Sequence, residues 1–96
     1  MKTRDEIIHI LAEHKPELAE RFKVRRLAVF GSWARGEQHA ESDVDILVDV
    51  DSSIGLNFVT LVEKVEELLE LKVDLVSFRA VKPRARKFIE KDLIYV

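Results

Sequence analysis

The sequence predicts a small α/β domain: a mixed sheet of three to four strands with helices on one face. Two observations carry this prediction. Some segments repeat their apolar residues with the period of a helix, and others alternate apolar and polar residues as a strand does. With 96 residues, 47% of them apolar and 35% charged, the chain has the size and composition of one globular domain, which we expect to span residues 1–96.

Apolar residues at helical spacing predict two long helices, at residues 4–22 and 58–69, and the second has the clearer period. Pro16 lies inside the first and is expected to kink or split it, because proline lacks the N–H that a helix interior needs. Residues 82–91 predict a basic helix with Pro83 in its first turn. A fourth, short helix is expected in the sequence SWAR, which follows the first strand.

Four strands are expected, and the second carries the signal on which the function depends. It alternates strictly, so Asp43 and Asp45 point to one face while the valines and isoleucine point to the other. The apolar side should pack under the helices, and the opposite face of the sheet must then carry the aspartates. The expected strands are residues 25–30, 43–50, 72–78 and, as a short edge strand, 93–96.

Composition excludes several classes of function. The net charge of −2, from 16 basic and 18 acidic residues, argues against a protein that coats nucleic acid, and we expect no stable nucleic-acid binding. The absence of cysteine excludes disulfides, zinc–thiolate sites and thiol chemistry. No apolar run has membrane-spanning length and the charged N-terminus is unlike a signal peptide, so a cytoplasmic protein without membrane contact is expected.

Three aspartates predict a metal site. Asp43 and Asp45 lie two residues apart on one strand, so their side chains are about 6.6 Å apart and point the same way. If the strand that holds Asp74 is the neighbour, a third carboxylate lies about 4.8 Å away. Such close negative charges repel unless a cation separates them, and oxygen ligands suit Mg²⁺ or Mn²⁺. Two such ions form the clamp used for phosphoryl and nucleotidyl transfer, which makes Asp43, Asp45 and Asp74 the expected metal ligands.

Gly31 and Ser32 predict a phosphate site next to the acidic residues. A glycine at the end of a strand lets the backbone approach a ligand closely, and a serine at the start of a helix offers a hydroxyl and free N–H groups. Arg35, one helical turn further on, either binds a phosphate or pairs with a carboxylate to hold the loop, and the sequence favours neither. With Asp43 and Asp45, these residues form the expected site for a nucleoside triphosphate and its metal ions.

Several features also have a simpler interpretation. Taken alone, the glycine–serine pair would be a turn with a helix cap, and Ser42 is expected to shape its loop rather than touch a ligand. Trp33 is expected to pack on the surface near the site, and Asp49 to be a solvated residue near the end of its strand. Residues 79–91 are strongly basic, which predicts either a solvated surface or a rim that binds a partner or phosphate.

The spacing of these residues is similar to a known signature. Gly31-Ser32, ten further residues and then Asp43-Val44-Asp45, within FGSWARG and SDVDILV and followed by KVDLVS, resembles the DNA-polymerase-β-like nucleotidyltransferase superfamily. The resemblance is specifically to the minimal nucleotidyltransferases of prokaryotic toxin–antitoxin pairs, and it extends over nearly the whole chain.

This resemblance implies a palm-like α/β core that binds ATP and Mg²⁺. It implies that Asp43, Asp45 and Asp74 hold the metal ions and are the catalytic carboxylates, and that Gly31 and Ser32 hold the triphosphate. Antitoxins of this group transfer AMP to a tyrosine of a helical HEPN-domain toxin, so such a toxin is the implied partner. Self-association of the chain into a homo-oligomer is a further option.

Two other functions remain open at the level of sequence. One is a nucleotide-binding module that masks its partner without turnover, and the three intact aspartates argue against it. The other is a transferase that acts on a small molecule or on a nucleic-acid end. The sequence has no acceptor-selecting domain and no basic excess, which argues against this second alternative.

Overall fold

The observed order of helices and strands is the one that the sequence predicts, with two short 3₁₀ turns added. The computed structural model describes residues 2–96. The elements are α1 (Arg4–Phe22), β1 (Val24–Phe30), α2 (Gly31–Arg35), β2 (Val44–Val50), η1 (Ser52–Ile54), α3 (Asn57–Leu69), β3 (Val73–Ser77), η2 (Phe78–Ala80), α4 (Pro83–Glu90) and β4 (Ile94–Tyr95).

Helix α1 begins at a capping box and runs through its proline. The Thr3 hydroxyl accepts from the Glu6 N–H while the Glu6 carboxylate accepts from the Thr3 N–H, which satisfies two N–H groups at the helix start. The expectation that Pro16 splits this helix is wrong. Leu11 before the proline and Leu18 after it are both fully buried, so packing on both sides offsets the hydrogen bond that proline removes.

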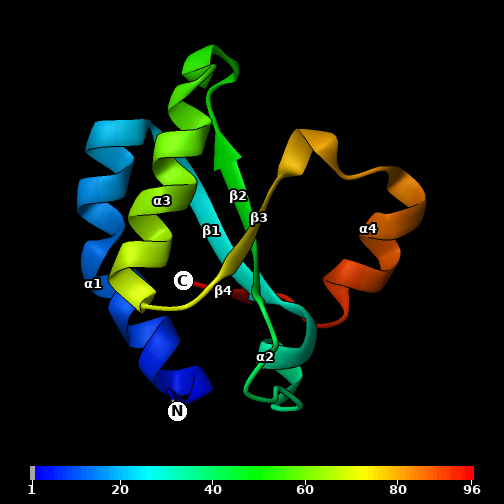
Figure 1. The fold of residues 1–96 in the computed structure, drawn as a ribbon. Coiled ribbons are helices and arrows are strands. Elements are labelled where there is room, and N and C mark those ends of the chain that lie inside the picture. The colour runs from blue at the N-terminus through cyan, green and yellow to red at the C-terminus, as the bar shows by residue number, and fades with distance from the viewer. Residues whose placement is uncertain (1) are drawn as a thin grey trace.

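The four strands form one mixed sheet in the order β3-β2-β1-β4. Strand β1 pairs antiparallel with both β2 and β4, whereas β2 and β3 are parallel. Parallel neighbours need a crossover connection, and α3 supplies it. Helices α1 and α3 lie together on one side of the sheet, and α4 lies on the other side (Figure 1).

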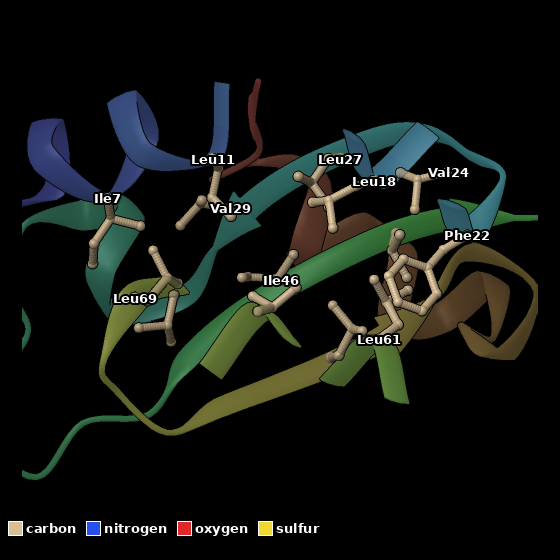
Figure 2. Packing of buried hydrophobic residues seen from close by; sticks show 14 of the residues in the cluster. Ile7, Leu11, Leu18, Phe22, Val24, Leu27, Val29, Ile46, Leu61 and Leu69 are labelled. Carbon is tan, nitrogen blue, oxygen red and sulfur yellow. The ribbon is translucent and has the colours of Figure 1, made fainter. Parts of the chain in front are cut away.

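The main core lies between the sheet and the α1–α3 layer. Figure 2 shows Leu11 and Leu18 of α1 and Leu61 of α3 directed toward Val29 and Ile46 of the central strands. All five are fully buried, and each such side chain contributes about 1.5–3 kcal/mol of burial free energy. The apolar face of β2 therefore packs under the long helices, as its alternation predicts.

A second, smaller core lies on the opposite face of the sheet, which corrects the expectation that all helices share one face. Ala28 and Leu47 are buried on this face together with Val81, and Ile89 and Leu93, in and just after α4, pack against them. Apolar side chains on the acidic face need cover from water, and the chain after β3 provides it. In residues 2–96, no helix is both long and apolar enough to cross a bilayer.

Candidate functional site

Strand register brings the predicted acidic residues into one row. Asp45 of β2 pairs with Asp74 of the parallel strand β3 on one side and with Phe30 of β1 on the other. Asp43 precedes the first residue of β2 and points to the same face by strand alternation. The expectation that the strand with Asp74 lies beside the strand with Asp45 is therefore confirmed.

Gly31 lies against the Asp45 carboxylate. It follows Phe30, the β1 partner of Asp45, and turns the chain into α2 with a positive φ of 74°. A Cβ at this position would lie 3.1 Å from Asp45 Cγ and would overlap Asp45 Oδ2. Only glycine combines this backbone conformation with this close approach, so the turn and the carboxylate are built as one unit.

Charge repulsion and burial act together on Asp45. Partial burial raises the pKa of the Asp45 carboxyl, and the nearby charges of Asp74 and then Asp43 raise this pKa further, while Arg35 opposes the shift. Asp45 is half-buried, whereas Asp43 and Asp74 are exposed. The electrostatic coupling means that these three carboxylates share one region of space, and that a cation placed among them would be stabilised.

The chemistry of this set fits a divalent metal ion, because all its donors are carboxylate oxygens and one of them is kept partly from water. The set is not closed around a fixed point: within residues 2–96, no three acidic or histidine side chains converge as a ready metal cage. Asp43 and Asp74 are exposed, so their side chains are free to turn toward a ligand. The three aspartates therefore have the donor chemistry of a metal site without its closed geometry.

Ser32 is not the cap of α2. The N-cap position belongs to Phe30, and no side chain of the described chain caps this helix. Ser32 is the second residue of α2 and is half-buried, and its carbonyl accepts from the N–H groups of Gly36 and of Glu37, the latter at 2.8 Å. The Gly31-Ser32 pair therefore forms the expected turn, but the interpretation of Ser32 as the cap at the start of the helix is wrong.

Arg35 pairs with carboxylates, which is one of the two roles left open for it. Its Nε donates to Glu37 Oε2 at 3.0 Å and its Nη1 to Asp92 Oδ2 at 2.9 Å. The second bond joins α2 to the segment between α4 and β4. The charge of Arg35 also opposes the rise in the pKa of Asp45, so the guanidinium is close enough to interact electrostatically with the acidic row.

Trp33 was expected on the surface and is instead buried, with 1% of its surface exposed. Its indole N–H donates to the Ser42 carbonyl at 3.2 Å, and the Ser42 hydroxyl accepts from the His39 N–H at 3.0 Å. The loop that leads into Asp43 is thus anchored at its end, and the expected local role of Ser42 is confirmed. A tryptophan directly after Gly-Ser is the signal that could have indicated this anchor.

Asp49 was expected to be solvated, and this is wrong. Its side chain is 15% exposed and pairs with Arg26 at 3.1 Å and with Arg25 at 3.6 Å. Asp49 lies on the same face as Asp45 but four residues further along β2, which is about 13 Å away. It balances neighbouring arginines and does not belong to the acidic row.

A glycine turn packed against a row of aspartates, on a small mixed sheet, defines a domain for nucleotidyl transfer. The nucleotidyltransferase domain family matches residues 11–96, and the chain belongs to this family. The resemblance deduced from the Gly31-Ser32 and Asp43-Val44-Asp45 spacing is confirmed.

Individual relatives agree with this assignment. Protein adenylyltransferase MntA from Thermococcus cleftensis is 47% identical over 97 residues, which cover 100% of this chain and 98% of that protein. A solved structure described provisionally as a minimal nucleotidyltransferase is 34% identical, with a TM-score of 0.66, and covers 95% of this chain and 86% of its own. A chain in a toxin–antitoxin crystal structure with AMP-PNP is 26% identical, with a TM-score of 0.64, over 98% of this chain and 72% of that one.

Proposed function

We propose that this protein transfers AMP from ATP to a hydroxyl of a partner protein and is the antitoxin of a toxin–antitoxin pair. The observation that carries the proposal is the packing of Gly31 against Asp45, which joins a phosphate-binding turn to the acidic row. The similarity to a protein adenylyltransferase and to a chain of a toxin–antitoxin complex with an ATP analogue supports the choice of nucleotide and partner. The partner that we infer is a helical HEPN-domain toxin, with a tyrosine as the acceptor.

Divalent ions fit the acidic row. Asp43, Asp45 and Asp74 are the ligands that we assign to Mg²⁺, in a pair of ions, with Mn²⁺ as an alternative. When bound, these ions would activate the acceptor hydroxyl and neutralise the charge that develops on the leaving pyrophosphate.

The residues of the chain position the substrates and handle the proton. Gly31 lets the triphosphate approach the backbone, and Ser32 donates to its oxygens from its hydroxyl and its N–H. The acceptor oxygen forms a bond to the α-phosphorus as the bond from this phosphorus to the bridging oxygen breaks, and pyrophosphate leaves. Asp74, at the outer end of the row, accepts the proton of the acceptor hydroxyl. Most of the rate enhancement comes from positioning and charge stabilisation.

Masking without turnover is the main alternative, and the state of Asp45 argues against it. A module that only covers its partner gains nothing from a half-buried carboxylate held beside two others, which raises the pKa of Asp45 and destabilises the charged form. Transfer to a small molecule is the other alternative, and the exposed position of Asp43 and Asp74 leaves the site open enough for a protein acceptor.

Co-expression with a helical HEPN-domain protein from the same organism tests the proposal. Mass spectrometry of that partner should find an added AMP with wild-type protein and none with the Asp43→Asn/Asp45→Asn variant. This variant should keep its fold, because removing two carboxylates relieves repulsion. A stable complex whose partner never gains AMP would mean that the protein masks its partner, and labelling of only small molecules by ATP would identify the other alternative.

A further inference from the structure

Helix α4 carries a basic stripe that the proposed chemistry does not use. Arg84, Lys87, Phe88 and Lys91 follow the spacing i, i+3, i+4, i+7, so they share one side of the helix, and all four are exposed. Phe88 is 69% exposed and has Lys91 Nζ 5.6 Å from its ring centre. Among residues 2–96, no carboxylate lies within ion-pair distance of Arg84, Lys87 or Lys91. We call these four residues the α4 stripe.

Helix α4, which carries the stripe on its outer side, lies on the face of the sheet to which the acidic row points. Helices α1 and α3 cover one face of the sheet and α4 lies on the other (Figure 1). Val44 and Ile46 of β2 are buried in the core under α1 and α3, so strand alternation directs the acidic row to the α4 side. Leu47, the next residue after Asp45 on this face and roughly 7 Å along the strand, belongs to the apolar cluster against which Ile89 of α4 packs. The Arg35–Asp92 ion pair joins the end of α4 to the site directly.

A polar cavity lies between α4 and the sheet, on the side of the helix that faces away from the α4 stripe. It has a volume of about 400 Å³, and its charged lining consists of Arg26, Asp49, Arg79, Arg86 and Glu90. Arg26 is balanced by Asp49 and stacks on Phe78, 4.5 Å from the ring centre. Arg79 and Arg86 have no carboxylate within 4 Å in the described chain, so the cavity offers two unpaired guanidinium groups to an acidic side chain from outside.

We propose that the α4 stripe is the docking surface for the acceptor protein, and that this protein carries acidic residues beside the hydroxyl that it presents. The inference rests on the proposed function and adds to it where the partner binds and which charge it bears. A protein is favoured over a nucleic acid, because a phosphate backbone on the α4 stripe would also run past the acidic row, where the two negative charges repel. An acidic protein surface can place its charges on α4 and a neutral tyrosine at the row.

Charge-swapped peptides test the docking surface without knowledge of the natural partner. The probes are fluorescent tyrosine peptides flanked by glutamates or by lysines, and a short oligouridine, with binding followed by fluorescence anisotropy at low salt. Wild-type protein should prefer the glutamate peptide, and added salt should weaken this binding. In Arg84→Glu/Lys87→Glu, affinity for the glutamate peptide should fall about tenfold or more, and the lysine peptide should become the better ligand. A glutamate at position 84, in the first turn of α4, is compatible with the helix dipole, whereas position 87 lies in the last turn, so circular dichroism of the variant must first show that its helix content matches wild type.

The matched control is Arg21→Glu/Lys23→Glu, which changes the net charge equally at the end of α1. Lys23 has the left-handed cap conformation that a glutamate, Glu70, adopts after α3, so the substitution is tolerated. This control should keep the wild-type preference. Equal losses of affinity in both double variants would mean that the peptide responds only to the net charge of the protein, which would overturn the proposal. Tighter binding of oligouridine than of the glutamate peptide would overturn it as well.

Transfer of labelled AMP to the same peptides separates the two proposals. If peptide binding depends on the α4 stripe but no AMP is transferred, the docking surface is supported and the proposed function is contradicted. AMP transfer that is insensitive to Arg84→Glu/Lys87→Glu would support the function and overturn the docking surface.

Discussion

Gly31 and Asp45 are packed so closely that the position of a Cβ on Gly31 lies 3.3 Å from Asp45 Cβ and inside the reach of its carboxylate. Gly31→Ala should therefore lower the free energy of unfolding by about 2–5 kcal/mol, from the strained positive φ and the overlap together. Chemical denaturation measures this loss, and ATP affinity should fall with it because the alanine displaces Asp45.

Gly36 provides the control for this prediction. Its φ of 73° matches that of Gly31, but no atom lies within 4 Å of a Cβ built on it. Gly36→Ala should lower the free energy of unfolding only by the strain of the positive φ, about 1–2 kcal/mol, and should leave ATP affinity unchanged. Equal effects of the two substitutions would mean that contact with Asp45 has no part in the requirement for glycine at position 31.

Asp45→Asn should stabilise the metal-free protein at neutral pH. The raised pKa of Asp45 means that the native state still holds a proton at pH values where the unfolded chain has released it. The free energy of unfolding therefore falls as the pH rises from 3.8, the ordinary pKa of an aspartate, through the raised pKa of Asp45. Asparagine carries no charge at any of these pH values, so the variant does not lose this stability. In thermal melts with a chelator, the variant should melt above wild type near pH 7 and together with it near pH 3.

Asp51 should behave in the opposite way. Hydrogen bonds from Ser53, with help from Arg25, lower the pKa of Asp51, so its charge stabilises the fold and this contribution is lost as the pH falls through the lowered pKa. Asp51→Asn should melt below wild type at neutral pH. A shift in the same direction for both variants would show that the local charge of Asp45 is not the cause.

Ser32→Ala should weaken ATP binding more than it weakens the fold. Because Ser32 does not cap α2, its loss should change the free energy of unfolding by less than about 0.5 kcal/mol. A lost hydrogen bond to a charged phosphate should reduce ATP affinity by about tenfold or more, as measured by titration calorimetry. Unchanged affinity with a lower melting temperature would assign Ser32 a structural role only.

Trp33→Phe should loosen the loop before Asp43 while keeping most of the packing. The substitution removes the indole N–H that donates to the Ser42 carbonyl, at an expected cost of about 1–3 kcal/mol. Hydrogen exchange in residues 37–43 should become faster than in wild type, and AMP transfer should slow because Asp43 is less well placed. Faster exchange spread over the whole chain, with none specific to the loop, would contradict this anchoring role.

The acidic row could be predicted from the sequence because its geometry is local. Strict alternation fixes the face of Asp43 and Asp45, and the valine and leucine around Asp74 fix its face in the same way. Only the pairing of β2 with β3 had to be assumed, and a helix between two strands favours a parallel pair. The glycine turn next to the row follows from the same short segment.

The position of α4 and the burial of Trp33 could not be predicted, because both depend on contacts between distant parts of the chain. The chain leaves β3 at one edge of the sheet and returns as β4 at the other, and periodicity does not say which face it crosses. Leu47, an apolar residue on an otherwise acidic face, was the available sign that something covers this face. Trp33 lies in a helix of five residues, which is too short for its buried side to be read from spacing.

Strand β3 forms an outer edge of the sheet, and Asp74 is exposed near its start. A free strand edge offers unpaired N–H and C=O groups to any other strand, and a charge on it is one of the ways in which proteins prevent such pairing. Two copies joined edge to edge through β3 would bring their Asp74 carboxylates near one another, where like charges repel. The charge of the residue that we assign to proton transfer thus also disfavours such pairing. An inactive Asp74→Asn variant, made to trap a complex with the acceptor, would give up this protection along with catalysis.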